Sequence, residues 1–421
     1  MDRSIDSLAD GINTKGGNSF IMKVFRKGLI RQFSKLENGY ILLQDGTEKE
    51  EFGNKNSDLR ATLQVHSPEF YVLLGTGGAI GAAEAYTAGY WSSDNMVGLM
   101  RIMSRNKEQL QNIDKGITRF IKPINSLIHR SRQNTLKGSR ANILAHYDLN
   151  NDFYKLWLDE TMTYSCAIFE PQDLSLAQAS IEKLDRVCRK LRLDENDRVI
   201  EIGTGWGSFA IHATKNYNCH VTTTTISDAQ HQYVRNLILQ NGLEKKITLL
   251  KKDYRLLEGK FSKLVSIEMI EAVGVKYIPE YIKTCSRLLE KDGMMAIQGI
   301  TYADQGFETH IRRVDFIKKY IFPGSNLISI ANIIENMKQH TDLSLVHLED
   351  ITRHYGTTLK SWRERFMNVI PEIKNLGFSD TFIRLWEFYF IYCEAGFREH
   401  FIGDVQMIMA KPGHRKVKIE Y

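Results

Sequence analysis

Features that would mark a membrane-spanning or disulfide-stabilised protein are missing from this chain of 421 residues. It has no run of about 18 apolar residues, so we expect no transmembrane helix. The polar N-terminus lacks the apolar stretch of a secretory signal. The five cysteines are scattered, form no CxxC pair and match no zinc spacing: Cys166, Cys188, Cys219, Cys285 and Cys393. We therefore expect reduced thiols, no metal site and a cytoplasmic location.

Acidic residues that would balance the basic ones are lacking near the N-terminus. Residues 1–140 contain 20 Lys and Arg against 14 Asp and Glu, and so carry the whole net charge of +6. Residues 115–140 hold seven basic side chains and no acidic one. Nucleic acid or an anionic membrane surface would each explain this segment. Because the sequence has no nucleic-acid motif, we favour an anionic membrane surface and expect peripheral association with it.

The length favours two domains. The first 20 residues are polar and show no periodicity, so we expect them to be disordered. Residues 21–130 combine short strand-like stretches with helical patterns, which predicts a small domain of mixed α+β structure. Residues 131–140 have the composition of a basic linker, and residues 141–421 follow as a larger second domain.

One helical pattern beside the linker has two interpretations. Between residues 113 and 128 apolar side chains recur at intervals of three and four, with basic side chains between them and Pro123 as a point of kinking. This helix would cover the core of the first domain, or it would lie on anionic lipid as an interfacial helix. The sequence leaves both interpretations open.

The second domain alternates strands and helices. Helical patterns separate five strand patterns, at residues 198–203, 220–225, 247–252, 264–269 and 294–301. This order predicts an α/β domain with a parallel sheet and helices on both faces. Strand-like runs at 343–348 and 405–410 would extend one edge of the sheet. Long helical patterns near 303–340 and 360–400 would cap the active site.

A glycine turn joins the first of these strands to its helix. In VIEIGTGWGSFAI, Gly203, Gly205 and Gly207 allow a tight turn and a close approach of the backbone to a ligand. A dinucleotide site would have the spacing GxGxxG and an acidic residue after the second strand. Here the spacing is GxGxG and the second strand reads HVTTTTIS. With Glu201 near enough to contact an aminoacyl group, S-adenosylmethionine is favoured over NAD.

Seven segments resemble, in the same order, the catalytic domain of cyclopropane fatty acid synthases. They are HYDLNNDFYKLWLDETMTYSCAIF (146–169), VIEIGTGWGSFAI (199–211), TISDAQ (225–230), KDYR (252–255), SIEMIEAVG (266–274), HYGTTLKSW (354–362) and FYFIYCEAGFREH (388–400). EAYTAGYWSSDNMVGLMRIM (84–103) is similar to the end of the smaller N-terminal domain of the bacterial enzymes. Relatives in this family include mycolic acid cyclopropane synthases and other lipid methyltransferases.

The resemblance implies a Rossmann-like methyltransferase sheet with helical cap insertions, and an N-terminal domain for lipid binding or homodimer formation. It also implies transfer of a methylene group from S-adenosylmethionine to the cis double bond of a phospholipid acyl chain, which gives a cyclopropane fatty acid. Methyl- or methylene-branched lipids are alternative products, and a small amine or aromatic compound is an alternative substrate. The cofactor motifs argue against a third hypothesis, a non-catalytic lipid- or NAD-binding module.

The same resemblance implies which residues bind S-adenosylmethionine. The matching motifs place eleven of them at the cofactor: Tyr164, Ser165, Glu201, Gly203, Gly205, Gly207, Thr225, Ser227, Gln230, Tyr254 and Arg255.

The expected reaction needs a base. Attack of an alkene on a sulfonium methyl leaves a carbocation, from which water must be excluded and a proton removed before a ring can close. The resemblance implies bicarbonate as the base, surrounded by Cys166, Glu271, Tyr355 and Cys393. Gln298 stands where familiar cyclopropane synthases carry a His. Its amide can donate a hydrogen bond to bicarbonate but cannot carry a proton, which favours methylated or methylene-branched products.

Two glutamates in SIEMIEAVG receive different predictions. Glu271 lies at the exit of a strand just before Gly274, where open α/β sheets place their ligands. We therefore expect a functional role for Glu271 and a supporting structural role for Glu268.

Overall fold

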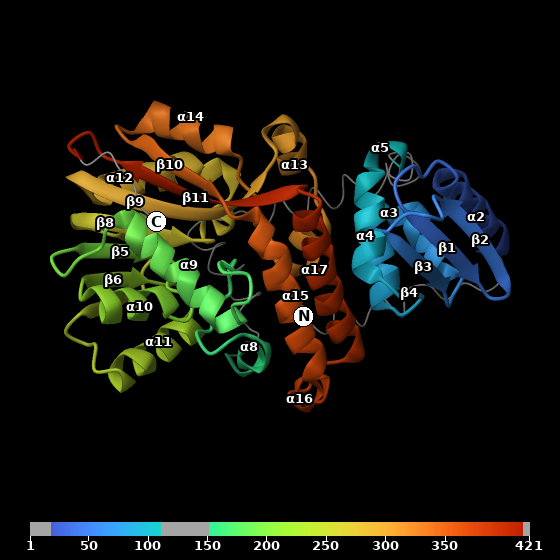
Figure 1. Ribbon diagram of the computed structural model, residues 1–421, viewed down its shortest axis with the longest axis horizontal. Coiled ribbons are helices and arrows are strands. Elements are labelled where there is room, and N and C mark those ends of the chain that lie inside the picture. Colours follow the sequence, from blue (N-terminus) through green and yellow to red (C-terminus); the bar gives the residue numbers. More distant parts are fainter. Residues whose placement is uncertain (1–17, 111–150, 416–421) are drawn as a thin grey trace. The chain divides into compact units, whose positions relative to one another are not determined.

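The structure, a computed structural model, describes residues 18–110 and 151–415 and contains two compact units (Figure 1). Among the described residues, the first unit comprises 18–110, 313–321 and 362–401, and the second comprises 151–312, 322–361 and 402–415. The sequence assigns 313–321 and 362–401 to the catalytic domain, whereas in the structure they group with the N-terminal residues. The prediction of disorder in residues 1–20 is wrong for residues 18–20, which begin a helix, and its remainder, 1–17, lies outside the described residues. The predicted helix at 113–128 and linker at 131–140 also lie outside them.

The first unit contains a four-stranded sheet in the order β2-β1-β3-β4. Its strands are β1 (Tyr40–Asp45), β2 (Glu48–Gly53), β3 (Arg60–Val65) and β4 (Trp91–Ser93). The central strands β1 and β3 are parallel, and each edge strand is antiparallel to its neighbour. The expected mixed α+β structure of the N-terminal region is confirmed.

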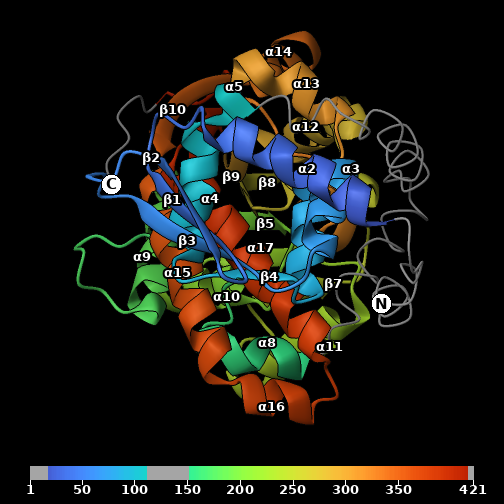
Figure 2. The ribbon, with the colours of Figure 1, turned by 90° about the vertical axis from the view of Figure 1, so that its right-hand side faces the viewer.

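Helices from distant parts of the chain complete this unit. They are α2 (Asn18–Phe33), α3 (Glu69–Thr87), α4 (Met96–Arg105), α5 (Lys107–Leu110), η6 (Ile317–Ile321), α16 (Ile370–Asn375) and α17 (Asp380–Arg398). The helix α2, which the sequence did not predict, lies along α3 (Figure 2). The C-terminal helix α17 packs against α3 and α4. Glu399, just after α17, accepts hydrogen bonds from Arg101 and Arg105 at 2.6 and 2.7 Å, which ties the two parts of the chain together.

The second unit contains a seven-stranded sheet in the order β10-β11-β9-β8-β5-β6-β7. The strands are β5 (Arg198–Ile202), β6 (His220–Thr224), β7 (Ile247–Leu250), β8 (Phe261–Ile267), β9 (Leu289–Tyr302), β10 (Ser344–Asp350) and β11 (Ile402–Ala410). Five strands are parallel, but β11 is antiparallel to β9 and β10 is antiparallel to β11. The two late strands extend one edge as predicted. The sheet is mixed, however, because β11 runs opposite to the other six strands, including β10 beside it.

Helices cover both faces of this sheet (Figure 1). One face packs against α9 (Leu176–Leu191), α10 (Ser208–Tyr217) and α11 (Asp228–Gln240), and the other against α12 (Ile278–Leu288) and α14 (Ile330–His340). Val199 belongs to the first core and Ile200 to the second, as the two-residue period of a strand requires. Further helices are α8 (Asn151–Trp157), α13 (Phe307–Arg312) and α15 (Thr352–Asn368), with turns η4 (Val275–Tyr277) and η5 (Asp304–Gly306). This is the expected α/β methyltransferase fold.

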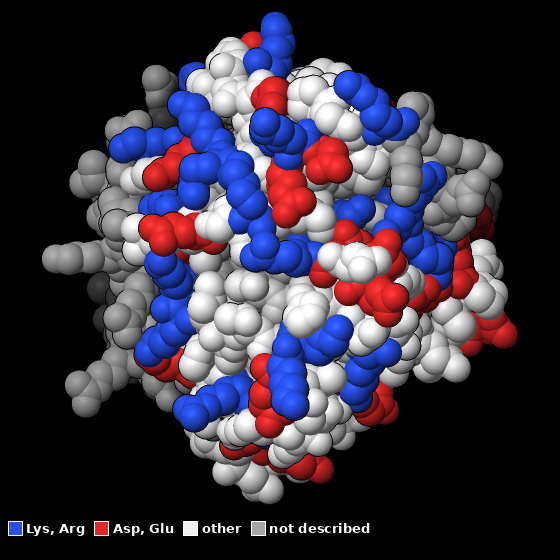
Figure 3. Space-filling view, turned by 90° about the vertical axis from the view of Figure 1, so that its left-hand side faces the viewer, with Lys and Arg blue, Asp and Glu red and all other residues white. Residues whose placement is uncertain are grey.

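Two further observations concern the surface charges and the length and polarity of the helices. On the face drawn in Figure 3, Lys and Arg side chains are interspersed with Asp and Glu, in keeping with the balanced charge of residues 141–421. In the described ranges, every helix is too short or too polar to cross a membrane.

Candidate active site

A cavity of about 190 Å³ in the second unit lies beyond the carboxyl ends of β5, β6 and β8, where open α/β sheets bind ligands. Nine of the eleven predicted cofactor residues line it: Tyr164, Ser165, Glu201, Gly203, Gly205, Thr225, Gln230, Tyr254 and Arg255. The other two begin helices instead. Gly207 is the N-cap residue of α10, and the Ser227 hydroxyl accepts a hydrogen bond from Gln230 N at the start of α11.

The glycine turn forms one wall of the cavity. Gly203, Gly205 and Gly207 all have positive φ, at 97°, 53° and 89°, which is strained for other residues. A Cβ atom on Gly203 would lie 2.8 Å from Met269 Cγ, whereas one on Gly205 would enter open space. The buried Thr204 hydroxyl lines the cavity and has no hydrogen-bond partner among the described residues. The turn therefore offers a ligand both room and a polar group.

Glu201 is a buried acid at the cavity wall. Its carboxylate accepts a hydrogen bond from the Thr223 hydroxyl at 2.5 Å. Burial raises the pKa of Glu201 to about 8, against the lowering effects of that hydrogen bond and of the Lys183 charge. A cationic ligand group beside Glu201 would favour its charged form, so the site is suited to an ammonium group.

Residues that come after β6 and β7 in the sequence form another part of the cavity wall. Thr225 Oγ1 donates to Gln230 Oε1 at 2.9 Å, and both residues are buried. In the turn η2 (Tyr254–Leu256), Arg255 forms a 2.7 Å ion pair with Asp253, which holds its side chain at the cavity. Rings of Tyr154, Trp206 and Tyr164 pack together behind the glycine turn, with centroid separations of 4.7 and 5.6 Å from Tyr154.

Three of the predicted catalytic residues meet at the carboxylate of Glu268, which also lines the cavity. The backbone N–H of Cys166 and Nε2 of Gln298 donate to Glu268 Oε1 at 2.7 and 2.8 Å. The Tyr355 hydroxyl donates to Oε2 at 2.5 Å. The structure therefore brings Cys166, Gln298 and Tyr355 together around a residue that the sequence places in a supporting role.

Glu271 lies close to this cluster in the turn η3 (Ile270–Ala272). Its Oε1 accepts a hydrogen bond from Ile300 N at 2.5 Å, and its buried Oε2 has no partner in the described part of the chain. Burial, and secondarily the charge of Glu268, raise the pKa of Glu271 to about 8. Glu271 therefore carries a proton at neutral pH.

The two predicted cysteines differ in their surroundings. The Cys166 thiol is fully buried, and burial raises its pKa well above the usual value, so only its backbone N–H serves the cluster. Cys393 lies on α17 in the first unit. That Cys393 lies beside Cys166, Glu271 and Tyr355 stays a prediction.

Comparison with known proteins gives the family. Residues 134–407 match the model of the family described as mycolic acid cyclopropane synthetase. The chain belongs to this family. It is 35% identical over 367 residues to the tuberculostearic acid methyltransferase of Mycobacterium tuberculosis, covering 85% of both proteins. It is 30% identical over 358 residues to the cyclopropane-fatty-acyl-phospholipid synthase of Escherichia coli, covering 85% of this chain and 89% of that protein.

A solved family member has the same catalytic fold. The crystal structure of a mycolic acid cyclopropane synthase complexed with SAH and CTAB matches with a TM-score of 0.61 and 29% identity. The match covers 65% of this chain and 98% of the other. The protein is thus an S-adenosylmethionine-dependent methyltransferase of the mycolic acid cyclopropane synthetase family.

The sequence analysis missed one charged residue at the cavity of this protein. Lys183, on α9, is 1% exposed, lines the cavity and donates to Ser165 Oγ at 2.7 Å. Its charge acts on both Glu268 and Asp404. A lysine on the core-facing side of an amphipathic helix has no signature that distinguishes it from a solvated one, so the sequence contained no signal for it.

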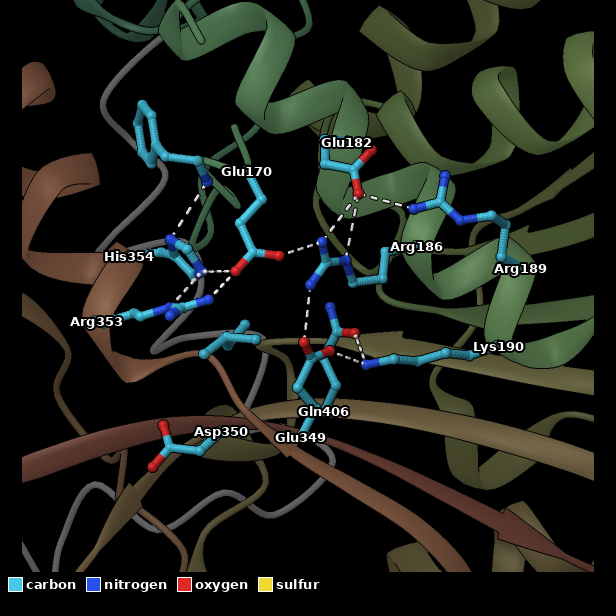
Figure 4. A network of polar contacts seen from close by, with 12 residues as sticks. Glu170, Glu182, Arg186, Arg189, Lys190, Glu349, Asp350, Arg353, His354 and Gln406 are labelled. Atoms are coloured by element: carbon cyan, nitrogen blue, oxygen red, sulfur yellow. Dashed lines mark hydrogen bonds and ion pairs between the residues drawn. The ribbon is translucent and has the colours of Figure 1, made fainter. Parts of the chain in front are cut away.

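A network of charged and polar residues lies between α9 and the strands β10 and β11 (Figure 4). Arg186 on α9 binds Glu170 at 2.6 Å and Glu349 on β10 at 2.8 Å. Buried Lys190 pairs with Glu349 and also donates to Gln406 Oε1 at 2.6 Å. These bonds join α9 to β10 and to β11, the strand that carries Gln406.

Proposed function

We propose that this protein transfers a one-carbon unit from S-adenosylmethionine to the cis double bond of an unsaturated phospholipid acyl chain, with a cyclopropane fatty acid as the product. The observation that carries the proposal is the position of Glu268. This residue lines the predicted methyl-donor cavity and also accepts hydrogen bonds from three predicted catalytic residues. Methylation of an alkene requires a proton acceptor beside the methyl donor, because the resulting cation must lose a proton.

The cavity residues fit S-adenosylmethionine. Gly205 leaves open space where a Cβ would stand, and Thr204 supplies an unpartnered hydroxyl within the described structure. Glu201 would pair with the ammonium group of the cofactor. When bound, the cofactor supplies an electrophilic methyl group. The aromatic faces of Tyr164 and Trp206 at the cavity exclude water and stabilise nearby positive charge by about 0.5–2 kcal/mol each.

Bicarbonate fits this site less well. The family resemblance surrounds it with Cys166, Glu271, Tyr355 and Cys393, with Gln298 as a further donor. In the structure the Cys166 N–H, the Tyr355 hydroxyl and the Gln298 amide already bind the carboxylate of Glu268. We therefore assign no step to bicarbonate.

A methyl- or methylene-branched product is the second candidate. Gln298 supports it, because an amide donates a hydrogen bond but carries no proton. The similarity to a tuberculostearic acid methyltransferase also supports it. Both products share the transfer of the methyl group and differ in the fate of the cation.

The substrate is proposed to be reached at an anionic membrane surface. The excess of basic residues in 1–140 supports this assignment. Sedimentation with vesicles distinguishes it from methylation of a small amine or aromatic compound. We expect binding to phosphatidylglycerol vesicles that weakens at high salt, and an enzyme for a small soluble substrate would stay in the supernatant.

Lipid analysis of an expressing host tests the proposed function. The host should lack cyclopropane fatty acids, and the control should be the Gly205→Val variant, whose side chain fills the cofactor turn. We expect a new acyl species with one added carbon in the wild-type host only. NMR of the purified lipid then distinguishes a cyclopropane ring from a methylene (=CH2) branch on the acyl chain. Unchanged acyl chains despite folded, cofactor-binding protein would contradict the proposal.

A further inference from the structure

The carboxylate of Glu268 occupies the position of a small bound anion. Its two oxygens accept hydrogen bonds from Cys166 N, Gln298 Nε2 and Tyr355 Oη at 2.5–2.8 Å. The backbone N–H and the amide N–H can only donate, so the Glu268 oxygen that they contact is an acceptor toward both. An added anion would have to displace Glu268 from these same groups.

The backbone fixes Glu268 in this place. Glu268 follows β8 directly and has φ of +46°, a left-handed conformation that is unfavourable for a residue other than glycine. Its N–H donates to Gln298 O at 2.9 Å, which holds the strand exit beside β9. Strained residues of this kind concentrate at functional sites. Here the strain places the Glu268 side chain at the cavity wall.

A relay of hydrogen bonds determines which way the Gln298 amide faces. Lys190 can only donate, so the atom of Gln406 that it contacts is the oxygen, at 2.6 Å. Gln406 Nε2 then donates to Gln298 Oε1 at 3.0 Å, and Gln298 Nε2 is left to donate to Glu268. Lys190 and Gln406, both labelled in Figure 4, thus orient the Gln298 amide so that its N–H group faces Glu268.

The neighbouring acids are suited to hold protons. Burial, then the charges of Glu268 and Glu271, raise the pKa of Asp404 well above its usual range, and the pKa of Glu271 is raised to about 8. Asp404 is fully buried and is absent from the cavity wall, as is Glu271. Lys183 lies near Glu268: burial lowers the pKa of Lys183, and the charge of Glu268 opposes that lowering. Glu268 is thus the member of this acidic group that faces both the cavity and the donors.

We propose that Glu268 is the catalytic base and that its carboxylate replaces bicarbonate in this protein. This inference rests on the proposed function. The alkene π electrons form a bond to the methyl carbon, the C–S bond breaks, and its electron pair stays on sulfur. A Glu268 oxygen then takes one proton from the added methyl group. The released C–H electrons close a cyclopropane ring, or, after a 1,2-hydride shift, they form the double bond of a methylene (=CH2) branch on the chain.

Three forms of the protein test this assignment: wild type, Glu268→Gln and Glu268→Gly. Turnover is measured as S-adenosylhomocysteine formed on dioleoylphosphatidylglycerol vesicles, in carbon-dioxide-depleted buffer with and without added bicarbonate. We expect a wild-type rate that changes less than about twofold, and a loss of about 100-fold or more in Glu268→Gln that bicarbonate does not restore. Glu268→Gly relaxes the left-handed backbone and opens the anion position, so bicarbonate should restore its turnover saturably.

Binding measurements give a second readout that does not depend on turnover. Titration calorimetry with S-adenosylhomocysteine should give similar affinities for the three forms, which shows that the cavity is folded. Carbon-13 NMR should detect binding of labelled bicarbonate to Glu268→Gly and not to wild type. Bicarbonate binding to wild type, a wild-type rate that falls tenfold on depletion, or full turnover by Glu268→Gln would overturn the assignment. No turnover on any unsaturated vesicle would instead contradict the proposed function, while the NMR result still decides the anion site.

Discussion

At the scale of single residues, two buried carboxyl groups make the stability of the folded protein depend on pH. Glu201 and Glu271 both have pKa values of about 8, raised from 4.5 chiefly by burial. Between pH 4.5 and 8 the folded protein keeps protons that the unfolded chain releases. Each group therefore makes the free energy of unfolding fall as pH rises through this window, by at most about 1.4 kcal/mol per pH unit.

The Glu201→Gln variant should lose one of these contributions. Its melting temperature relative to wild type should rise from pH 5 to pH 8 and level off above pH 8, because the amide releases no proton. Thermal unfolding of the cofactor-free proteins across this range measures the difference. A melting-temperature difference that is the same at every pH would contradict the assigned burial of Glu201.

The Gly205→Ala variant separates cofactor binding from backbone strain, with Gly242→Ala as its control. Both glycines have left-handed φ, at 53° and 64°, and a Cβ atom on either meets nothing within 4 Å. Both variants should therefore lose a similar 1–2 kcal/mol or so of stability. Only Gly205→Ala should weaken S-adenosylmethionine binding, by about tenfold or more, equivalent to about 1.4 kcal/mol. Equal cofactor affinities in the two variants by calorimetry would show that the turn is not the binding site.

The sequence predicted the glycine turn but not the role of Glu268. The turn has a spacing with a direct backbone meaning, so Gly203 and Gly205 could be placed at the cavity from the letters alone. Glu268 and Glu271 stand three residues apart at one strand exit, and the sequence does not say which of them faces the cavity. That depends on the left-handed conformation of Glu268, which is unusual for a glutamate.

At the scale of elements, α9 connects the surface ion pairs to the site. Lys190 on this helix is fully buried, where burial lowers its pKa despite the opposing effect of Glu349. Its bond to Gln406 begins the relay that ends at Glu268. The sequence predicted strands containing Gln298 and Gln406, but their pairing followed only from the antiparallel register of β9 and β11.

The Lys190→Met variant should reveal this connection. Loss of the buried cation leaves Oε2 of Glu349 and the Gln406 oxygen without their donor, although Arg186 still pairs with Oε1 of Glu349. We expect a loss of stability of about 3–5 kcal/mol in urea unfolding. Turnover should fall more than cofactor affinity, because the Gln298 amide is no longer held. Lys245→Met, at an exposed lysine, is the control and should change neither. Unaltered turnover in Lys190→Met would show that the relay has no part in the reaction.

At the scale of the whole molecule, the units are not continuous in sequence. The strand and helix order of the catalytic sheet followed from alternating patterns, and the family resemblance extended over the same region. Residues 362–401 also carry family-like motifs, yet they group with the N-terminal unit through α17 and its contacts with α3 and α4. Such long-range packing has no local signature, so the predicted domain boundary did not include it.

Isotope transfer tests the central claim most directly. Purified protein would be incubated with dioleoylphosphatidylglycerol vesicles and S-adenosylmethionine that carries a trideuterated methyl group, and the acyl chains analysed by mass spectrometry. The account predicts a one-carbon product that retains two of the three deuterium atoms, because one leaves the added methyl group to the base. Acyl chains without deuterium, or with all three atoms retained, would contradict it.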